Sequence, residues 1–116
     1  MEVKEAILSF LNSQKMMNLS TYKGSLWSCS VYFVVDEDFS LYFSSSDKSK
    51  HIQQIRSNPQ VAFSVYDSHQ NFEDKKMGVQ GVGECKKLID VHTAEWIAYL
   101  WNKNINVRNG CIRSCR

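Results

Sequence analysis

Hydrophobic residues recur with a helical period at the start of the sequence. The stripe consists of Val3, Ala6, Ile7, Phe10 and Leu11. Residues three and four apart lie on one helix face, so this spacing predicts an amphipathic helix of roughly three turns. A second stripe between Val91 and Trp101 predicts another helix, with Asp90 as its N-cap. A short helix is expected to end before Pro59, because proline disfavours helical backbone in the preceding residue.

Alternating apolar and polar residues predict five strands. Their ranges are 15–22, 26–35, 39–45, 60–66 and 77–88. Met17, Leu19 and Thr21 are expected on one side of the first strand, and short turns at 23–25 and 36–38 join the first three strands. Strands therefore dominate, with helices before, between and after them. This order predicts a mainly β or α+β domain, built as a small antiparallel barrel with flanking helices.

Three glycines interrupt the last predicted strand. They occupy positions 78, 81 and 83. Glycine inside a strand often marks a bulge or a site where another backbone or a ligand approaches closely. Either feature is expected in this strand.

Composition and charge fit one globular domain. The chain has 116 residues, of which 43% are hydrophobic and 22% charged, and its net charge of +2 is too small to indicate binding to nucleic acid. The first residues lack the basic and apolar regions of a signal peptide. No apolar run approaches the ~20 residues of a membrane span. A cytoplasmic protein with neither membrane nor nucleic-acid partners is expected.

The four cysteines do not form a metal-binding motif in the sequence. Cys29 and Cys85 lie within apolar strand patterns, where a thiol behaves as a small hydrophobic group. Cys111 and Cys115 fall in the last residues and are interpreted as adventitious thiols. The histidines at 51, 69 and 92 are too scattered to propose a metal site. We therefore expect a reduced protein with neither a disulfide framework nor a bound metal.

Hydroxyls and cations gather where the third strand runs into the short helix. The cluster consists of Ser44, Ser45, Ser46, Lys48, Ser49, Lys50 and His51. Unpaired amides at a helix N-terminus and the positive end of its dipole favour an anion. The cations and small hydroxyl donors favour a phosphate in particular. The alternative is a solvated loop with an ordinary Ser or Asp helix cap.

Sequence motifs of catalysis are absent. The chain has no P-loop, Rossmann fingerprint or Gly-x-Ser-x-Gly motif, and no nucleophile and base form an obvious pair. No catalytic residue is therefore named. The remaining route to chemistry is a bound cofactor that the protein positions.

Several segments together resemble a known family. The segments are Trp27–Asp38, Leu41–Ser45, Ser49–His51, Asn58–Phe63 and Gly81–Glu84. Their order and spacing are similar to those of the pyridoxamine 5′-phosphate oxidase-like FMN-binding split barrels, and in particular of their short bacterial members. The resemblance covers roughly residues 1–88. It implies a Greek-key-like split barrel that binds FMN as a homodimer, with the flavin at the subunit interface.

The resemblance also implies which residues hold FMN. Ser45, with Ser44 beside it, occupies the hydroxyl position at the end of the third strand. Ser49, Lys50 and His51 occupy the phosphate-binding triplet that opens the next helix. A further segment of the second strand, whose backbone contacts the isoalloxazine ring in this family, comprises Ser28, Cys29, Ser30 and Val31.

The chain also departs from the family pattern. His51 stands where lysine is common, which replaces a permanent charge by a titratable one. The arginine often found in the second strand is absent, and the substrate-binding arginine and histidine of the vitamin B6 enzyme have no counterpart. These departures argue against oxidation of pyridoxamine phosphate. Family members usually add one more strand after the second helix, and that strand is expected to be missing.

These interpretations combine into one hypothesis with two alternatives. Residues 1–102 are expected to form the FMN-binding split barrel, without its last strand, and residues 103–116 an irregular basic tail. The expected function is a flavoprotein of oxidoreductase type that transfers hydride between flavin and an unknown small substrate. The alternatives are a flavin or haem binding module without turnover, and a fragment that binds neither.

Overall fold

A computed structural model describes residues 2–75 and 77–87, together with the backbone of residues 111–115. Two helices and six strands are assigned within these ranges. They are α1 (Val3–Ser13), β1 (Met16–Tyr22), β2 (Leu26–Val35), β3 (Leu41–Ser45), α2 (Lys50–Ser57), β4 (Gln60–Tyr66), β5 (Gly78–Lys87) and β6 (Cys111–Cys115). The five strands expected from the sequence are confirmed to within two residues at either end. No described helix has the length and apolar character needed to cross a membrane.

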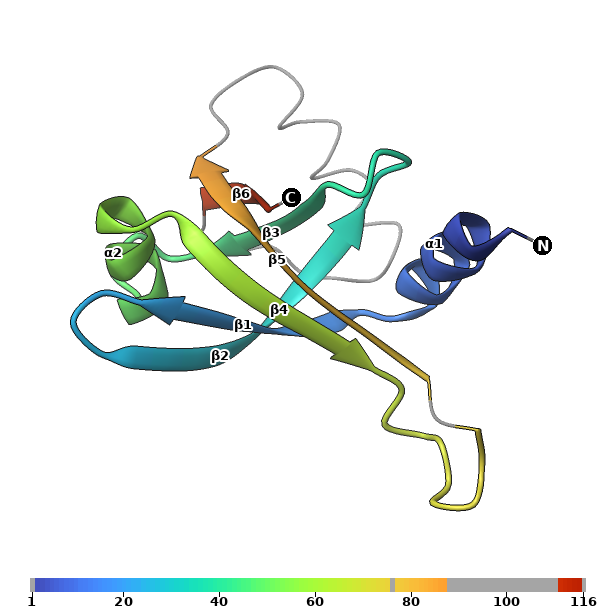
Figure 1. Ribbon diagram of the computed structural model, residues 1–116. Coiled ribbons are helices and arrows are strands. Elements are labelled where there is room, and N and C mark those ends of the chain that lie inside the picture. Colours follow the sequence, from blue (N-terminus) through green and yellow to red (C-terminus); the bar gives the residue numbers. More distant parts are fainter. Residues whose placement is uncertain (1, 76, 88–110, 116) are drawn as a thin grey trace.

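The strands form a closed antiparallel barrel in the order β1-β2-β3-β6-β5-β4. One sheet contains β1, β2, β4 and β5, and the other contains β2, β3, β5 and β6, so β2 and β5 are shared. Figure 1 shows α2 beside the turn that joins β1 and β2, while α1 lies near the other end of that hairpin. The predicted antiparallel barrel with flanking helices is therefore confirmed.

Strand β1 has the orientation that its alternating pattern predicts. Met17, Leu19 and Thr21 are at most 3% exposed. Met17 pairs with Val31 and Leu19 pairs with Cys29 on β2. Since directly paired residues share a face of the sheet, the side chains of Val31 and Cys29 also point toward the barrel interior.

The barrel interior is a single cluster of apolar side chains. Its largest completely buried members are Phe33 on β2 and Phe43 on β3, which pair directly. Ile52 and Ile55 of α2 join the same cluster, as the sequence predicts. Full burial of one such side chain contributes about 1.5–3 kcal/mol to folding.

Helix α1 packs on the barrel from Ile7 onward, but not through its first turn. Phe10 and Leu11 are buried, whereas Val3, the first member of the predicted stripe, is 76% exposed. The backbone N–H of Phe33 donates a 3.0 Å hydrogen bond to the carbonyl oxygen of Lys15, just after the helix. The helix is therefore fixed to β2 at one end, and its first turn lies outside the core.

Strand β6 corrects the expectation of a missing last strand and an irregular tail. Residues Cys111–Cys115 pair with β3 on one side and β5 on the other. These five residues lack an alternating apolar pattern, so their pairing depends on the backbone edges of β3 and β5 rather than on a signal of their own. Residues 88–110, where the second long helix and the domain boundary at 102 were predicted, lie outside the described residues.

The close approach predicted at the glycines of β5 is made by an aromatic ring. Gly81 pairs directly with Phe63 of β4. A Cβ atom added at Gly81 would lie 2.9 Å from Cε1 of Phe63. Glycine is therefore required here by a ring from the same barrel.

Candidate functional site

The corner between β3 and α2 brings three of the predicted phosphate-binding residues together. The Nε2 atom of His51 lies 2.7 Å from Oγ of Ser45 and 3.5 Å from Oγ of Ser49. The first distance is that of a good hydrogen bond, and the second is at the limit of one. Ser45 ends β3 and Ser49 precedes α2, so the short loop between them creates this cluster.

The helix cap of the alternative interpretation is not formed by a serine side chain. Ser49 occupies the N-cap position of α2, but its hydroxyl makes no cap hydrogen bond. It donates instead to the carbonyl oxygen of Ser46 at 2.6 Å. Asp47 forms an ion pair with Arg56 at 3.1 Å, and both side chains are about half exposed, so this pair is weakly stabilising. The first turn of α2 therefore keeps its electropositive end toward the corner.

His51 and Lys50 have different surroundings although they are adjacent in α2. The His51 side chain is only 9% exposed, and its ring centroid lies 6.4 Å from that of Phe43. Lys50 is exposed, and its ammonium lies 4.4 Å from the ring centroid of Trp27. The buried imidazole is placed to orient the Ser45 hydroxyl, whereas Lys50 presents its charge at the surface. A cation–π contact at an exposed site contributes about 0.5–1 kcal/mol.

Helix α2 is held against the β1–β2 hairpin by polar side chains, of which Thr21 and Gln54 are buried. The Thr21 hydroxyl donates to Oε1 of Gln54 at 2.6 Å. Nε2 of Gln54 donates to the carbonyl oxygen and to the hydroxyl of Ser25, both at 3.3 Å. Asn58 adds a 2.9 Å bond to the carbonyl oxygen of Tyr22. These contacts fix the helix that carries Ser49 and Lys50.

The predicted ring-binding segment lies along the part of β2 that is not paired with β3. Strand β2 pairs with β1 from Leu26 to Tyr32, but with β3 only from Phe33 to Val35. The backbone edge of residues 28–31 on the side of β3 is therefore outside that ladder. Within the segment, Cys29 and Val31 face the interior, while Ser30 faces outward and donates to Oδ1 of Asn18 at 2.8 Å.

Sequence reasoning missed two residues that connect this site. Trp27 joins β2 to α2 through Lys50, and Gln54 joins α2 to the hairpin. Lys50 and Trp27 are 23 positions apart, so no local spacing pattern predicts their contact. The burial of Gln54 is weakly indicated by the sequence, because this residue lies between the core residues Ile52 and Ile55 on a short helix.

Burial raises the pKa of the Cys29 thiol above its ordinary value. The folded chain therefore favours the neutral thiol, and the reactive thiolate forms at a higher pH than in the unfolded chain. We expect the pH midpoint for alkylation of Cys29 by iodoacetamide to be higher in buffer than in urea. Mass spectrometry of the tryptic fragment Gly24–Lys48, which contains this cysteine alone, measures it. Equal midpoints in the two conditions would contradict the expectation.

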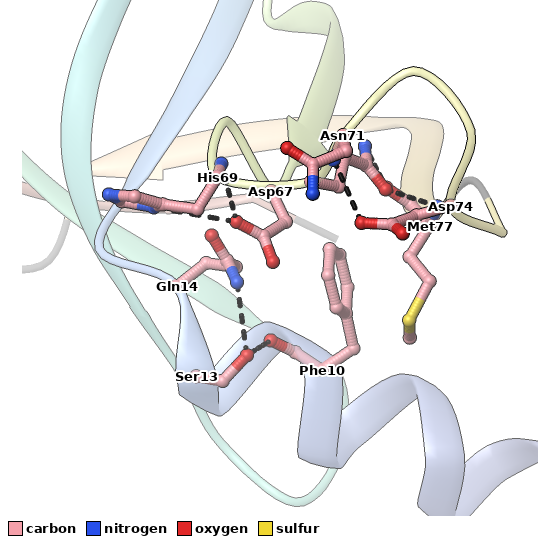
Figure 2. Close-up of polar contacts among 9 residues, drawn as sticks. Phe10, Ser13, Gln14, Asp67, His69, Asn71, Asp74 and Met77 are labelled. Atoms are coloured by element: carbon pink, nitrogen blue, oxygen red, sulfur yellow. Dashed lines mark hydrogen bonds and ion pairs between the residues drawn. The ribbon is translucent and has the colours of Figure 1, made fainter.

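A separate open groove of about 800 Å³ lies where α1 meets β1, next to the middle of β2 and the end of β4. Ser30 is the one predicted site residue that lines it, alongside the tyrosines Tyr32 and Tyr66. Figure 2 shows the loops at its rim, where His69 contacts Asp67 and Gln14 donates to Ser13. The groove is thus distinct from the corner of hydroxyls and cations, and Ser30 belongs to both the groove and the ring-binding segment.

Metal ligands do not cluster in the described part of the chain. Within it, no three His, Cys, Asp or Glu side chains come together in a group that could hold a metal ion. The donors at the corner are hydroxyls, an imidazole and an ammonium, which is a set suited to a phosphate.

Comparison with known proteins places the chain in a family. The sequence profile of pyridoxamine 5′-phosphate oxidase matches residues 3–104, which is most of the chain. No curated protein matches the sequence significantly.

Solved structures share the fold at low sequence identity. A candidate pyridoxamine 5′-phosphate oxidase from Listeria innocua gives a TM-score of 0.77 at 16% identity, over 99% of this chain and 93% of that one. The haem storage protein HutZ from Vibrio cholerae gives 0.73 at 12% identity, over 100% and 90%. An FAD-binding protein from Mesorhizobium loti gives 0.69 at 18% identity, over 100% and 96%. The fold is thus common to all three, and the profile match shows that the chain belongs to the pyridoxamine 5′-phosphate oxidase family.

Proposed function

We propose that the protein is an FMN-binding flavoprotein of oxidoreductase type. The observation that carries this proposal is the corner in which His51 lies within hydrogen-bonding reach of Ser45 and Ser49, beside Lys50 in the first turn of α2. Hydroxyl donors, a surface ammonium and the helix dipole together suit the phosphate ester of FMN. The family membership and the FAD-binding neighbour from Mesorhizobium loti support a flavin in this fold.

The residues divide the work of holding the phosphate. Lys50 supplies the positive charge, and its contact with Trp27 limits the positions of the ammonium before a ligand arrives. Ser45, Ser44 and Ser49 supply hydroxyl donors. His51 is buried and bonded to Ser45, so its role is to aim that hydroxyl rather than to contact the phosphate directly.

The isoalloxazine ring is proposed to lie along β2. Residues 28–31 follow Trp27, which contacts Lys50 at the corner. They lead toward the groove, where Ser30 is one of the lining residues. Their backbone edge on the side of β3 lies outside the β2–β3 ladder, so its N–H and C=O groups can bond the polar edge of a flat ring. This segment spans about 10 Å of strand.

The cofactor supplies the hydride chemistry when it is bound, and the chain binds and orients it. No described side chain is assigned as a general acid or base, and the substrate is an unidentified small molecule. Pyridoxamine phosphate itself is not proposed, because the arginine and histidine that bind it have no counterpart in the sequence.

A homodimer is proposed to complete the site. Large apolar side chains are exposed on the outer face of the barrel, and several lie on the sheet of β1, β2, β4 and β5. They are Met16, Tyr22, Leu26, Tyr32, Tyr66 and Val82, each between 45% and 82% exposed. Met16 pairs directly with Tyr32, and Tyr22 pairs directly with Leu26, so these exposed side chains adjoin in two pairs on the outer face. Exposed apolar groups that lie together favour an interaction surface. The cytoplasm remains the proposed location.

Removing two groups of the corner tests the flavin assignment. Ser49→Ala with Lys50→Ala deletes a hydroxyl and a charge, so we expect FMN to bind at least about tenfold more weakly, since charge-assisted contacts are lost. Quenching of flavin fluorescence measures the affinity, and size-exclusion chromatography in the same experiment detects the dimer.

A matched control changes the same residue types on the other helix. Lys4→Ala with Ser9→Ala removes an exposed lysine and an exposed serine from α1, and it should leave FMN affinity unchanged. Equal affinities in the Ser49–Lys50 variant and the parent would count against the proposed phosphate site.

Haem binding is the second candidate, and the similarity to the haem storage protein from Vibrio cholerae favours it. The absorption spectrum separates the candidates. Flavin bands with reduction by a nicotinamide donor support the oxidoreductase, and flavin bands without turnover support a carrier. A Soret band supports haem, and a colourless protein that ignores added FMN supports a chain that binds neither.

A further inference from the structure

Two cysteines far apart in the sequence are direct partners in the barrel. Cys85 on β5 is paired with Cys115 on β6. Directly opposed residues of antiparallel strands have Cα atoms about 4.5–5.5 Å apart, and disulfide-bonded cysteines have Cα atoms about 4.4–6.8 Å apart. The register therefore places these two cysteines within the range that a disulfide requires.

The backbone hydrogen bonding identifies the type of pair. The N–H of Cys85 donates a 2.9 Å bond to the carbonyl oxygen of Pro59, on the side of β4. The N–H and C=O of a strand residue point to the same side, so Cys85 turns its backbone polar groups away from β6. Cys85 and Cys115 therefore occupy a non-hydrogen-bonded position of the ladder, where opposed Cα atoms are about 4.5 Å apart.

The surroundings place this pair on the interior face of the barrel. Cys85 is 4% exposed and belongs to the core cluster. The partner of Cys115 on its other side is Leu41 of β3, which is 2% exposed. Residues paired across a sheet share a face, so the position of Cys115 is on the same face as these two core residues.

We propose that Cys85 and Cys115 form a reversible disulfide that fastens β6 to β5 under oxidising conditions. The oxidant is a low-molecular-weight disulfide such as oxidised glutathione. One cysteine thiolate attacks it, forms a mixed disulfide and releases one glutathione. The second cysteine thiolate displaces the other glutathione and closes the Cys85–Cys115 bond. Two electrons pass to the glutathione disulfide, and the two cysteine protons end on the two glutathione thiols.

The disulfide changes the stability of the strand that closes the barrel. It encloses residues 86–114, and restricting a loop of about 30 residues in the unfolded chain stabilises the folded one. Strand β6 also pairs with Ser44 and Ser45 of β3. Fastening β6 therefore supports the strand that carries the hydroxyls of the corner. This inference stands independently of any bound flavin, because it rests on the strand register, the backbone hydrogen bonding and the burial of Cys85.

Tryptic mapping of the full chain tests the pairing. After incubation with oxidised glutathione and blocking of remaining thiols, fragment Met77–Lys86 should be joined to Ser114–Arg116. Trypsin cuts after Arg113, so Cys111 lies in a separate fragment and cannot be confused with Cys115. We expect the melting temperature to rise by about 10 °C on oxidation and to return on addition of dithiothreitol.

Single substitutions at the two tail cysteines provide the comparison. Cys115→Ser should lose both the joined fragments and the rise in melting temperature, whereas Cys111→Ser should keep both. Cys85→Ala should lose the joined fragments and the rise in melting temperature as well. Its melting temperature after oxidation is compared with that of the same variant under reducing conditions. The proposal is overturned if Cys111 replaces Cys115 in the joined fragments, if the link joins two chains, if it is absent, or if it forms without changing the melting temperature.

Discussion

Replacing Phe33 by alanine should lower the free energy of unfolding by about 3–5 kcal/mol. Phe33 is completely buried at the centre of the core and pairs with Phe43 across β2 and β3. The substitution removes the apolar contacts of a whole ring and leaves a cavity that a closed barrel cannot easily collapse. Urea denaturation followed by circular dichroism measures the change.

Phe72→Ala is the matched control for this prediction. It removes the same ring from the loop between β4 and β5, where the side chain is 92% exposed. A surface substitution of this kind should change the free energy of unfolding by no more than about 0.5 kcal/mol. Similar losses in the two variants would contradict the assignment of Phe33 to the core of the barrel.

Replacing Gln54 by alanine should lower the free energy of unfolding by about 1–3 kcal/mol and also weaken FMN binding. The Thr21 hydroxyl, which is 3% exposed, would lose its acceptor, and Ser25 would lose its donor. A buried polar group without a partner bears the full cost of its desolvation. Because Gln54 fixes the helix that carries Ser49 and Lys50, loosening it also disturbs the corner.

The neighbouring glutamine separates these effects from a general change in helix propensity. Gln53 is exposed, and its side chain bonds only to the carbonyl oxygen of Lys48, at 3.1 Å, among the contacts of the described residues. Gln53→Ala should therefore alter neither stability nor FMN affinity beyond experimental error. Loss of stability in the Gln54 variant with unchanged FMN affinity would place the flavin elsewhere on the barrel.

The sequence predicts the fold well where local pattern and burial agree. The alternation of Met17, Leu19 and Thr21 identifies both a strand and its buried side, and Pro59 marks the end of a helix. The corner at Ser45, Ser49 and His51 could be predicted for a related reason, since the strand, loop and helix that create it are consecutive in the chain.

Features that depend on distant parts of the chain could not be predicted in this way. The Lys50–Trp27 contact and the bond between Thr21 and Gln54 exist only after α2 packs on the β1–β2 hairpin. Strand β6 has no pattern of its own and is defined by its neighbours. Val3 shows the opposite error, because a regular stripe predicted burial where the barrel offers no surface to cover it.

The position of β6 between β3 and β5 also governs how the protein is made. A ribosome synthesises a chain from its N-terminus to its C-terminus, and a domain folds as a unit once all of its strands have been made. Strand β6 lies between β3 and β5 in the barrel and hydrogen-bonds to both. Its residues are synthesised after all of the other described strands. The barrel wall of the nascent polypeptide is therefore incomplete until Cys115 has left the exit tunnel.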